Sequence, residues 1–134
     1  MAEEIVNLKQ EYPEIMPELI DYKHPIEKSK DLLFEIDAAI TTTLGGIAET
    51  GSLILWPTPD EPRLMSLVPP IHIAVLNSKN IYSTFLEAMI SGNWVSEMPT
   101  NALLISGPSK TADIEQTLVY GIHGCKELVV ILIQ

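Results

Sequence analysis

The chain has 134 residues, 46% of them hydrophobic and 19% charged, which suits one domain with a single core and excludes intrinsic disorder over most of its length. Eight basic against eighteen acidic side chains leave a formal net charge of −10. A negative field of this size repels phosphate backbones and anionic lipid headgroups, so we expect no nucleic-acid partner and no membrane partner.

The termini and the single cysteine predict a cytoplasmic protein. Glu3 and Glu4 stand where an export signal would be basic. The longest apolar run, Leu128 to Ile133, falls well short of the roughly 20 residues that a membrane-spanning helix needs. Cys125 has no second cysteine with which to form an internal disulfide, which favours a reducing compartment.

Charge divides the chain into two parts. The first 37 residues hold ten acids and four bases, whereas residues 38–134 hold eight acids and four bases. Three prolines interrupt the first part, so we predict a short helical N-terminal segment over residues 1–36 and an α/β domain over residues 37–134. Because the second part carries so little charge, we expect some of its surface to be covered in a homo-oligomer.

The first half of the domain is predicted to consist of strands and one long loop. β-branched and apolar runs predict strands at residues 38–44 and 52–56, joined by a glycine-rich turn, and a third strand at residues 71–76. Residues 57–70 contain five prolines, which indicates an ordered loop of the kind that often carries function.

The second half is predicted to alternate helices with strands. Ile81, Phe85 and Met89 repeat every four residues, which predicts a helix ending at Gly92. Residues 102–106 read as a strand, and residues 112–120 as a helix ended by glycine.

The last apolar run, residues 128–133, reads as a strand. Like residues 102–106, it shows no polar alternation, which is typical of strands in the middle of a parallel sheet that helices cover on both faces. The fold class that we predict is therefore α/β, with a mostly parallel sheet.

The loop between the strand at 102–106 and the helix predicted at 112–120 is a candidate anion site. Gly107, Ser109, Lys110 and Thr111 would bring free amides, hydroxyls and one ammonium to a helix start. The spacing is not that of a Walker A loop, which disfavours nucleotide hydrolysis. The alternative is that Thr111 or Asp113 only caps the helix.

The glycine-rich turn at residues 45–51 is a second candidate. Gly46 and Gly51 permit sharp turning or close approach to a ligand, and Thr50 adds a hydroxyl. Between them Glu49 could act as a base, an acyl acceptor or a hydroxyl binder. The alternative is a glutamate that projects into solvent from a hairpin.

Arg63 is the only arginine, and it lies in the proline-rich loop. A guanidinium fork suits a carboxylate or a phosphate, so Arg63 could clamp an anion. An internal salt bridge is equally compatible with its position, with one of three acids as partner: Glu49, Asp60 or Glu61.

His72, His123 and Cys125 complete the candidates. Each histidine is either a hydrogen-bonded structural imidazole or part of the site, His72 as a proton carrier and His123 as a ligand contact. Neither has a partner at metal-ligand spacing, so no metal site and no cofactor are expected. Cys125 lies beside Gly124 and Lys126 and could be a slightly activated thiol, although no base is paired with it.

Three segments in this order resemble the LUD domain, which is typified by the lactate utilisation protein C family. They are Gly46-Ile47-Ala48-Glu49-Thr50-Gly51-Ser52, Pro62-Arg63 through Ser66-Leu67-Val68-Pro69-Pro70-Ile71-His72-Ile73, and Gly107-Pro108-Ser109-Lys110-Thr111-Ala112-Asp113-Ile114-Glu115, with Gly121-Ile122-His123-Gly124 as a fourth. The resemblance covers residues 37–134. Cys125 stands where the family tends to have proline, and Lys110 where arginine is common.

The resemblance implies a three-layer Rossmann-like sandwich of the NagB, RpiA and CoA-transferase type, here without part of the family's N-terminal region. It also implies an accessory role beside iron-sulfur proteins that oxidise L-lactate to pyruvate. Arg63, Lys110 and the amides near Ser109 would then hold a small anion, and Glu49 or His72 would handle a proton. The alternatives are a stand-alone acyl or CoA transferase or sugar-phosphate isomerase, and a purely structural subunit.

Overall fold

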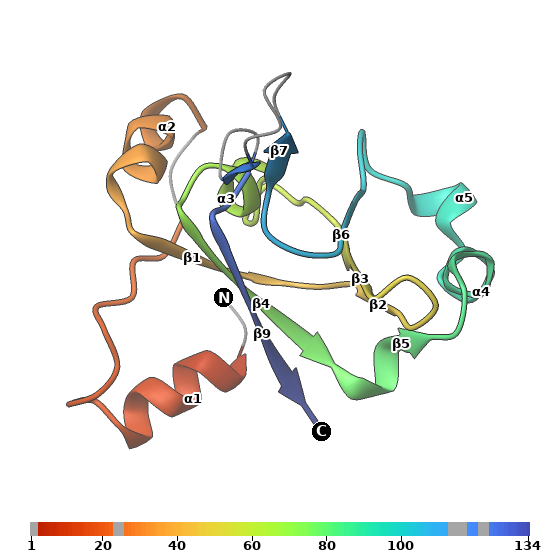
Figure 1. Cartoon of the computed structure of the whole chain (residues 1–134). Helices are drawn as coiled ribbons and strands as arrows, with labels where there is room; N and C mark the ends of the chain where they lie inside the picture. The colour runs from red at the N-terminus through yellow and green to blue at the C-terminus, as the bar shows by residue number, and fades with distance from the viewer. Residues whose placement is uncertain (1–2, 23–25, 113–117, 121–123) are drawn as a thin grey trace.

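The computed structural model describes residues 3–22, 26–112, 118–120 and 124–134 (Figure 1). Its helices are α1 (Glu3–Glu11), α2 (Ile26–Glu35), α3 (Leu64–Leu67), α4 (Phe85–Ser91) and α5 (Trp94–Glu97), with a 3-10 turn, η1 (Ser78–Asn80). Its strands are β1 (Ala38–Thr42), β2 (Gly45–Ile47), β3 (Ser52–Leu55), β4 (Ile71–Asn77), β5 (Ile81–Tyr82), β6 (Leu103–Ile105), β7 (Lys110–Ala112), β8 (Leu118–Tyr120) and β9 (Glu127–Ile133). Within these described ranges, no helix has the length and apolarity needed to span a membrane.

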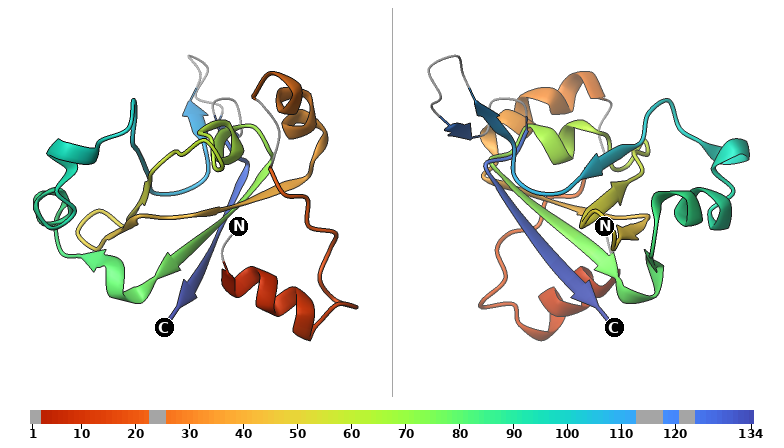
Figure 2. Two further views of the ribbon diagram at one scale, coloured as in Figure 1. Left: turned by 180° about the vertical axis from the view of Figure 1, so that it is seen from behind. Right: turned by 45° about the vertical axis from the view of Figure 1, so that its right-hand side comes forward.

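Three parallel strands form the main sheet, in the order β1-β4-β9. The central strand, β4, pairs with β9 from Ile71 opposite Glu127 to Asn77 opposite Ile133. Figures 1 and 2 show α1 and α2 on one side of this sheet and the other sheet, with α4 and α5, on the opposite side.

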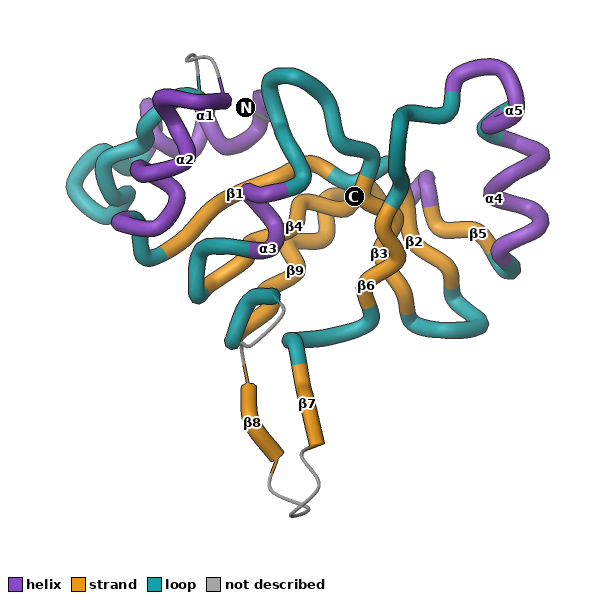
Figure 3. Tube along the Cα trace, turned by 90° about the horizontal axis from the view of Figure 1, so that it is seen from above, coloured by secondary structure: helices purple, strands orange, loops and turns teal. Residues whose placement is uncertain are grey.

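The second sheet has four short strands in the order β5-β2-β3-β6. β2 and β3 form an antiparallel hairpin whose turn ends at Gly51, and this glycine has a positive φ of 61°. A Cβ atom on Gly45 would collide with the carbonyl oxygen of Asn80, so β2 can pass η1 this closely only with glycine there. β7 and β8 form a separate antiparallel pair that projects away from both sheets (Figure 3).

Apolar side chains join the two sheets and the short helices. Leu53 of β3 packs on Ala74 and Leu76 of β4, with Ile105 and Leu128 against them. Because side chains alternate along a strand, this face of β4 also carries His72.

A second cluster fastens α4 and α5 to the hairpin. Ile47 and Ile54 pack with Ala88 and Trp94, and the Trp94 ring lies edge-on to Trp56 at a centroid distance of 5.0 Å.

The α4 helix begins at Phe85 and not at Ile81, where the predicted helix began, and a reciprocal cap marks this start. Thr84 Oγ1 accepts a hydrogen bond from the Glu87 N–H at 3.2 Å, and Glu87 Oε2 accepts one from the Ser83 N–H at 2.6 Å.

Much of the predicted architecture is confirmed. The class is mixed α/β and the main sheet is parallel, as the apolar runs predicted. The strands predicted at residues 71–76, 102–106 and 128–133 are β4, β6 and β9. The three-layer NagB-like arrangement and the division of the chain at residue 37 stay predictions.

Three details of the prediction are wrong. Residues 112 and 118–120 lie in strands, so the helix predicted over 112–120 is wrong at these described residues. The glycine-rich segment contributes β2 itself, and β3 pairs with β2 instead of with the strand at residues 38–42. β6 and β9 are the last strands of their sheets within the described residues, whereas we expected central positions for both.

Candidate functional site

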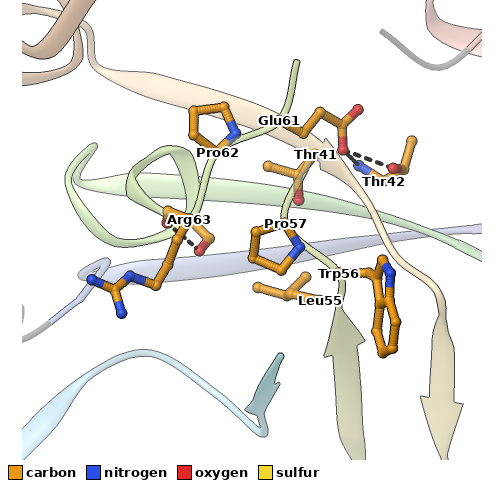
Figure 4. Close-up of a pocket in the computed structure, with 9 residues that line it drawn as sticks. Thr41, Thr42, Leu55, Trp56, Pro57, Glu61, Pro62 and Arg63 are labelled. Carbon is orange, nitrogen blue, oxygen red and sulfur yellow. Dashed lines mark hydrogen bonds between the residues drawn. The ribbon is translucent and has the colours of Figure 1, made fainter. Parts of the chain in front are cut away.

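A small polar pocket lies where β1 and β3 end and the proline-rich loop crosses them (Figure 4). Its volume is about 10 Å³, which is room for one water molecule. In open α/β sheets, ligands bind beyond the carboxyl ends of the strands, and β1 ends here. The lining residues are Thr41, Thr42, Leu55, Trp56, Pro57, Glu61, Pro62, Arg63 and Ser66.

The carboxylate of Glu61 closes the outer edge of β1. Its Oε2 accepts hydrogen bonds from the Thr42 N–H at 2.9 Å and from the Thr42 hydroxyl at 2.7 Å (Figure 4). A turn holds Glu61 in place, because its N–H donates to Thr58 Oγ1 at 3.0 Å. The carboxylate is therefore fixed, and it satisfies a strand amide that points away from β4.

His72 is buried directly behind this pocket. It is 0% exposed, and its Nε2 lies 2.8 Å from the hydroxyl oxygen of Thr41. Its Nδ1 has no hydrogen-bond partner among the described residues. Burial lowers the pKa of His72 from 6.5 to about 4, against a smaller opposing effect from the charge of Glu61. The ring is thus neutral at physiological pH.

Arg63 lies at the rim of the pocket, at the start of α3. Its carbonyl oxygen accepts a hydrogen bond from the Ser66 hydroxyl at 2.9 Å, while its side chain is exposed. Figure 4 shows the guanidinium pointing away from the Glu61 carboxylate. In the described part of the chain, none of the predicted salt bridges of Arg63 to Glu49, Asp60 or Glu61 forms, so its charge remains available to a ligand.

A larger cleft opens between the two sheets, beside the glycine-rich turn. Its volume is about 320 Å³, at the lower end of the range for small-molecule sites, and its lining is mainly apolar. The residues around it are Gly46, Ile47, Ala48, Gly51, Ser52, Leu53, Leu76, Ile81, Ile105, Ser106, Leu128 and Val130. Glu49 and Arg63 are not among them.

The sequence model of the LUD domain matches residues 6–133. The chain belongs to the LUD domain family. The Neisseria meningitidis protein NMB1437 is 45% identical over 118 residues, which are 87% of this chain and 51% of that protein. A lactate utilization protein C from Macrococcus caseolyticus is 38% identical over 82 residues, covering 58% of this chain and 36% of that protein.

Two further comparisons agree with this membership. The Bacillus subtilis lactate utilization protein C is 32% identical over 103 residues, 74% of this chain and 43% of that protein. A crystal structure of a DUF162 family protein from Deinococcus radiodurans matches with a TM-score of 0.54 and 27% identity, covering 76% of this chain and 56% of that one. The chain therefore spans about half the length of its relatives in the LUD family.

The helix start on which the anion site near residue 109 was predicted to lie is absent from the described residues of this LUD chain, and the ligand roles themselves stay predictions. Lys110 and Thr111 lie on β7, and a strand does not gather free amides as a helix start does. Gly107 precedes this strand, and the N–H of Ser109 donates to the Cys125 carbonyl oxygen at 2.9 Å. Two further predicted ligand residues, Asp113 and His123, lie outside the described residues.

The glycine-rich turn holds Glu49 on the surface of the domain. The Glu49 side chain is exposed, and its N–H donates to the Ser83 carbonyl oxygen at 3.1 Å. The Thr50 hydroxyl donates to Ser52 Oγ at 2.8 Å, which braces the turn. Gly46 and Gly51 line the apolar cleft, so the turn and Arg63 do not share a cavity.

The thiol of Cys125 is buried instead of activated. Burial raises its pKa, and the backbone N–H groups of Cys125, Ser109 and His72 oppose this only in part. The possibility of a slightly activated thiol is therefore not supported.

Sequence reasoning missed Thr41, Thr42 and the anchoring role of Glu61. Thr41 and Thr42 occur in a run of three threonines, which reads as an ordinary strand pattern. Thr41 is 31 positions from His72, and Glu61 is 19 from Thr42, so only the fold reveals these contacts. In the described residues, no group of three potential metal ligands occurs.

Proposed function

We propose that this chain works in lactate utilisation, as an accessory subunit of the system that oxidises L-lactate to pyruvate. The observation that carries the proposal is the family match over residues 6–133, together with relatives that are named lactate utilization protein C. Because the chain covers only 36% and 43% of those two relatives, the proposal concerns a contribution to the system and not the complete activity.

Iron-sulfur proteins are the partners that we propose for this role. Lactate oxidation releases two electrons, which a redox centre must accept. Iron-sulfur clusters are usually held by four cysteine thiolates, and the chain has one cysteine, Cys125, which is buried. The clusters would therefore be carried by other proteins of the system.

The ligand that we propose is a small carboxylate or phosphate bound at the rim of the polar pocket. Arg63 supplies an exposed guanidinium at this rim, and Thr41, Thr42 and Ser66 are among the polar residues that line the pocket. The pocket itself is too small for such an anion, so the ligand would lie over its mouth, with Arg63 as clamp. Lys110 and the predicted proton roles of Glu49 and His72 stay predictions.

A thermal-unfolding screen tests the ligand. L-lactate, pyruvate and inorganic phosphate are each added to the wild-type chain, to Arg63→Ala and to the control Lys79→Ala, whose exposed lysine lies on η1. At 100 times its Kd a ligand adds about 2.7 kcal/mol to the free energy of unfolding, an increase in Tm of several degrees. We expect this increase in the wild type and Lys79→Ala and not in Arg63→Ala. An equal increase in all three proteins would reject the Arg63 site.

A purification experiment tests the partners. The tagged chain is isolated from its own cells after growth on L-lactate, and iron and acid-labile sulfide are measured in the eluate. Both should co-purify with the chain and be absent after growth on glucose. An eluate without iron under both conditions would contradict the accessory role.

The transferase alternative has a simple test of its own. Glu49 is exposed and lies on the rim of neither cavity, so no observation favours it as a nucleophile. An acyl-CoA exchange assay that gives equal rates for the wild type and Glu49→Ala excludes that alternative.

A further inference from the structure

We propose that the apolar cleft between the two sheets binds a small neutral molecule, one that is made largely of hydrocarbon and carries a single hydroxyl or carbonyl group. This site is separate from the polar pocket beside Arg63, because the two cavities share no lining residue in the described part of the chain. The inference rests on the walls of the cleft, and it does not depend on the role in lactate utilisation.

The first observation is that the cleft is apolar from its floor to its rim. Leu53 and Leu76 form the floor, where they pack on one another and are 6% and 7% exposed. Ile81 and Val130 form part of the walls and are 44% and 46% exposed, so the rim meets solvent. A hydrocarbon body placed in the cleft would remove both levels from water, which is favourable in proportion to the apolar area buried.

The second observation is that backbone pairing fixes the walls of the cleft. One wall belongs to the β2–β3 hairpin, and the other belongs to β4 and β9, which pair along seven residues. A Cβ atom on Gly46 would lie 3.4 Å from the Leu76 side chain, so even a methyl group there would occupy space between the hairpin and β4. The cleft is thus formed before any ligand binds, as small-molecule sites usually are.

The third observation is the chemistry of the lining, which selects the class of ligand. None of the described lining residues is charged. A carboxylate or a phosphate would lose its hydration here without gaining a cation, which is costly. The side-chain hydroxyls of the lining belong to Ser52 and Ser106, and they can bond one neutral polar group. An alcohol or a carbonyl compound therefore suits the cleft, and an anion does not.

The volume of the cleft sets the size of the ligand. At about 320 Å³ it lies at the lower end of the range for small-molecule sites, which favours a single ring system or a medium-length alkyl chain over a large cofactor. Ordered water is a poor occupant, because each buried water molecule needs several polar partners and the lining is mainly apolar.

A fluorescence titration tests the proposal. The probe is N-phenylnaphthylamine, which is neutral and apolar and fluoresces strongly when it leaves water. We expect it to bind the wild-type chain at one saturable site and to be displaced by octanol. Octanoate has the same chain length but carries a carboxylate, and when it is ionised we expect it to displace the probe at least tenfold more weakly than octanol does.

Two lysine substitutions on the same face of β9 give a matched comparison. Val130 lines the cleft, whereas Leu132, which is 49% exposed, is not among the described lining residues. We expect Val130→Lys to weaken binding of the probe at least fivefold and to strengthen binding of octanoate, because it places an ammonium in the cleft. Leu132→Lys should bind both compounds as the wild type does. Circular dichroism establishes that each variant is folded.

A measurement on the wild type locates the bound molecule without any substitution. Octanol should shift the methyl NMR signals of Leu53, Leu76 and Val130, which line the cleft. It should leave the signals of Val95 unchanged, although this side chain is 95% exposed on α5. The comparison separates the cleft from other exposed apolar side chains.

Three results would overturn the proposal. The first is a wild-type chain that does not bind the probe, or that binds it without saturation. The second is octanoate that displaces the probe as well as octanol does, or equal probe affinity in Val130→Lys and Leu132→Lys. The third is an octanol complex in which the methyl signals of Leu76 do not shift, or a homodimer whose formation expels the probe at low protein concentration, which would make a second copy the occupant.

Discussion

The two edge strands of the parallel sheet, β1 and β9, differ in how far other parts of the chain cover them. At β1 the outward-pointing amide of Thr42 is bonded by the Glu61 carboxylate, and α3 and the proline-rich loop cover the strand. At β9 the side chains of Val129, Val130 and Leu132 stay about half exposed. The two edge strands of one sheet thus differ in how much apolar side chain they expose, because the proline-rich loop and α3 cover β1 and no described element covers β9 to the same extent.

The largest expected effect on stability comes from comparing the same change, leucine to alanine, in the neighbouring strands β4 and β9. Leu76 of β4 and Leu132 of β9 are partners in the register and share a face, but Leu76 is buried. We expect Leu76→Ala to lower the free energy of unfolding by about 2 to 4 kcal/mol, and Leu132→Ala by less than about 1 kcal/mol. Urea unfolding measures both. Equal losses would mean that β9 is as well packed as β4.

The stability of the β1 side of the sheet should also depend on pH, because the buried His72 bonds Thr41 of β1. Its pKa is about 4 in the folded chain and 6.5 when unperturbed, so the unfolded chain binds the proton first as the pH falls. The free energy of unfolding should therefore decrease from about pH 6.5 to about pH 4, by about 3 kcal/mol, and then level off. The difference between the wild type and His72→Gln isolates this contribution from that of the carboxyl groups. A constant difference across the window would contradict the burial of the ring.

The Thr41 hydroxyl should matter more than its size suggests. Thr41→Val keeps the shape of the side chain but removes the hydrogen-bond partner of the buried His72 Nε2. We expect a loss of about 1 to 3 kcal/mol in the free energy of unfolding. Thr50→Val is the control, because its hydroxyl bonds Ser52 at the surface, and it should cost less than about 0.5 kcal/mol. Similar losses in the two variants would show that His72 does not need this partner.

The smallest effect is expected at the edge bond of β1. Glu61→Gln keeps an acceptor for the Thr42 amide but removes the charge, so we expect a loss of about 1 kcal/mol. The change should also lower the pKa of His72 further, since the charge of Glu61 raises it. An NMR titration of the His72 ring measures the shift. Glu49→Gln, on the exposed turn, should leave the ring pKa unchanged.

Local patterns predicted the strands well because β-branched and apolar runs report burial directly. Ile71 to Leu76 and Leu128 to Ile133 are both strands of the parallel sheet, as expected. Whether a strand is central depends on what lies beside it, which its own residues do not encode. The doubly apolar pattern of β9 thus led to a wrong position in this chain.

The predicted helix is also wrong at its described residues, 112 and 118–120. Apolar spacing and a following glycine favoured a helix, but Val119 and Tyr120 have high strand propensity and pair with β7. The contacts of the candidate site could not be predicted from local patterns either. Arg63 and His72 were found from residue type, whereas the contacts that define their surroundings join positions 19 and 31 apart.

The chain's one thiol is enclosed at the point where β9 begins. Cys125 is 5% exposed, and the Ser109 segment lies across it through the bond to its carbonyl oxygen. Because the side chain is buried, an oxidant or alkylating reagent should modify the sulfur more slowly than it modifies an exposed cysteine. The rate of that modification would therefore report how often the chain opens around Cys125, where β9 begins.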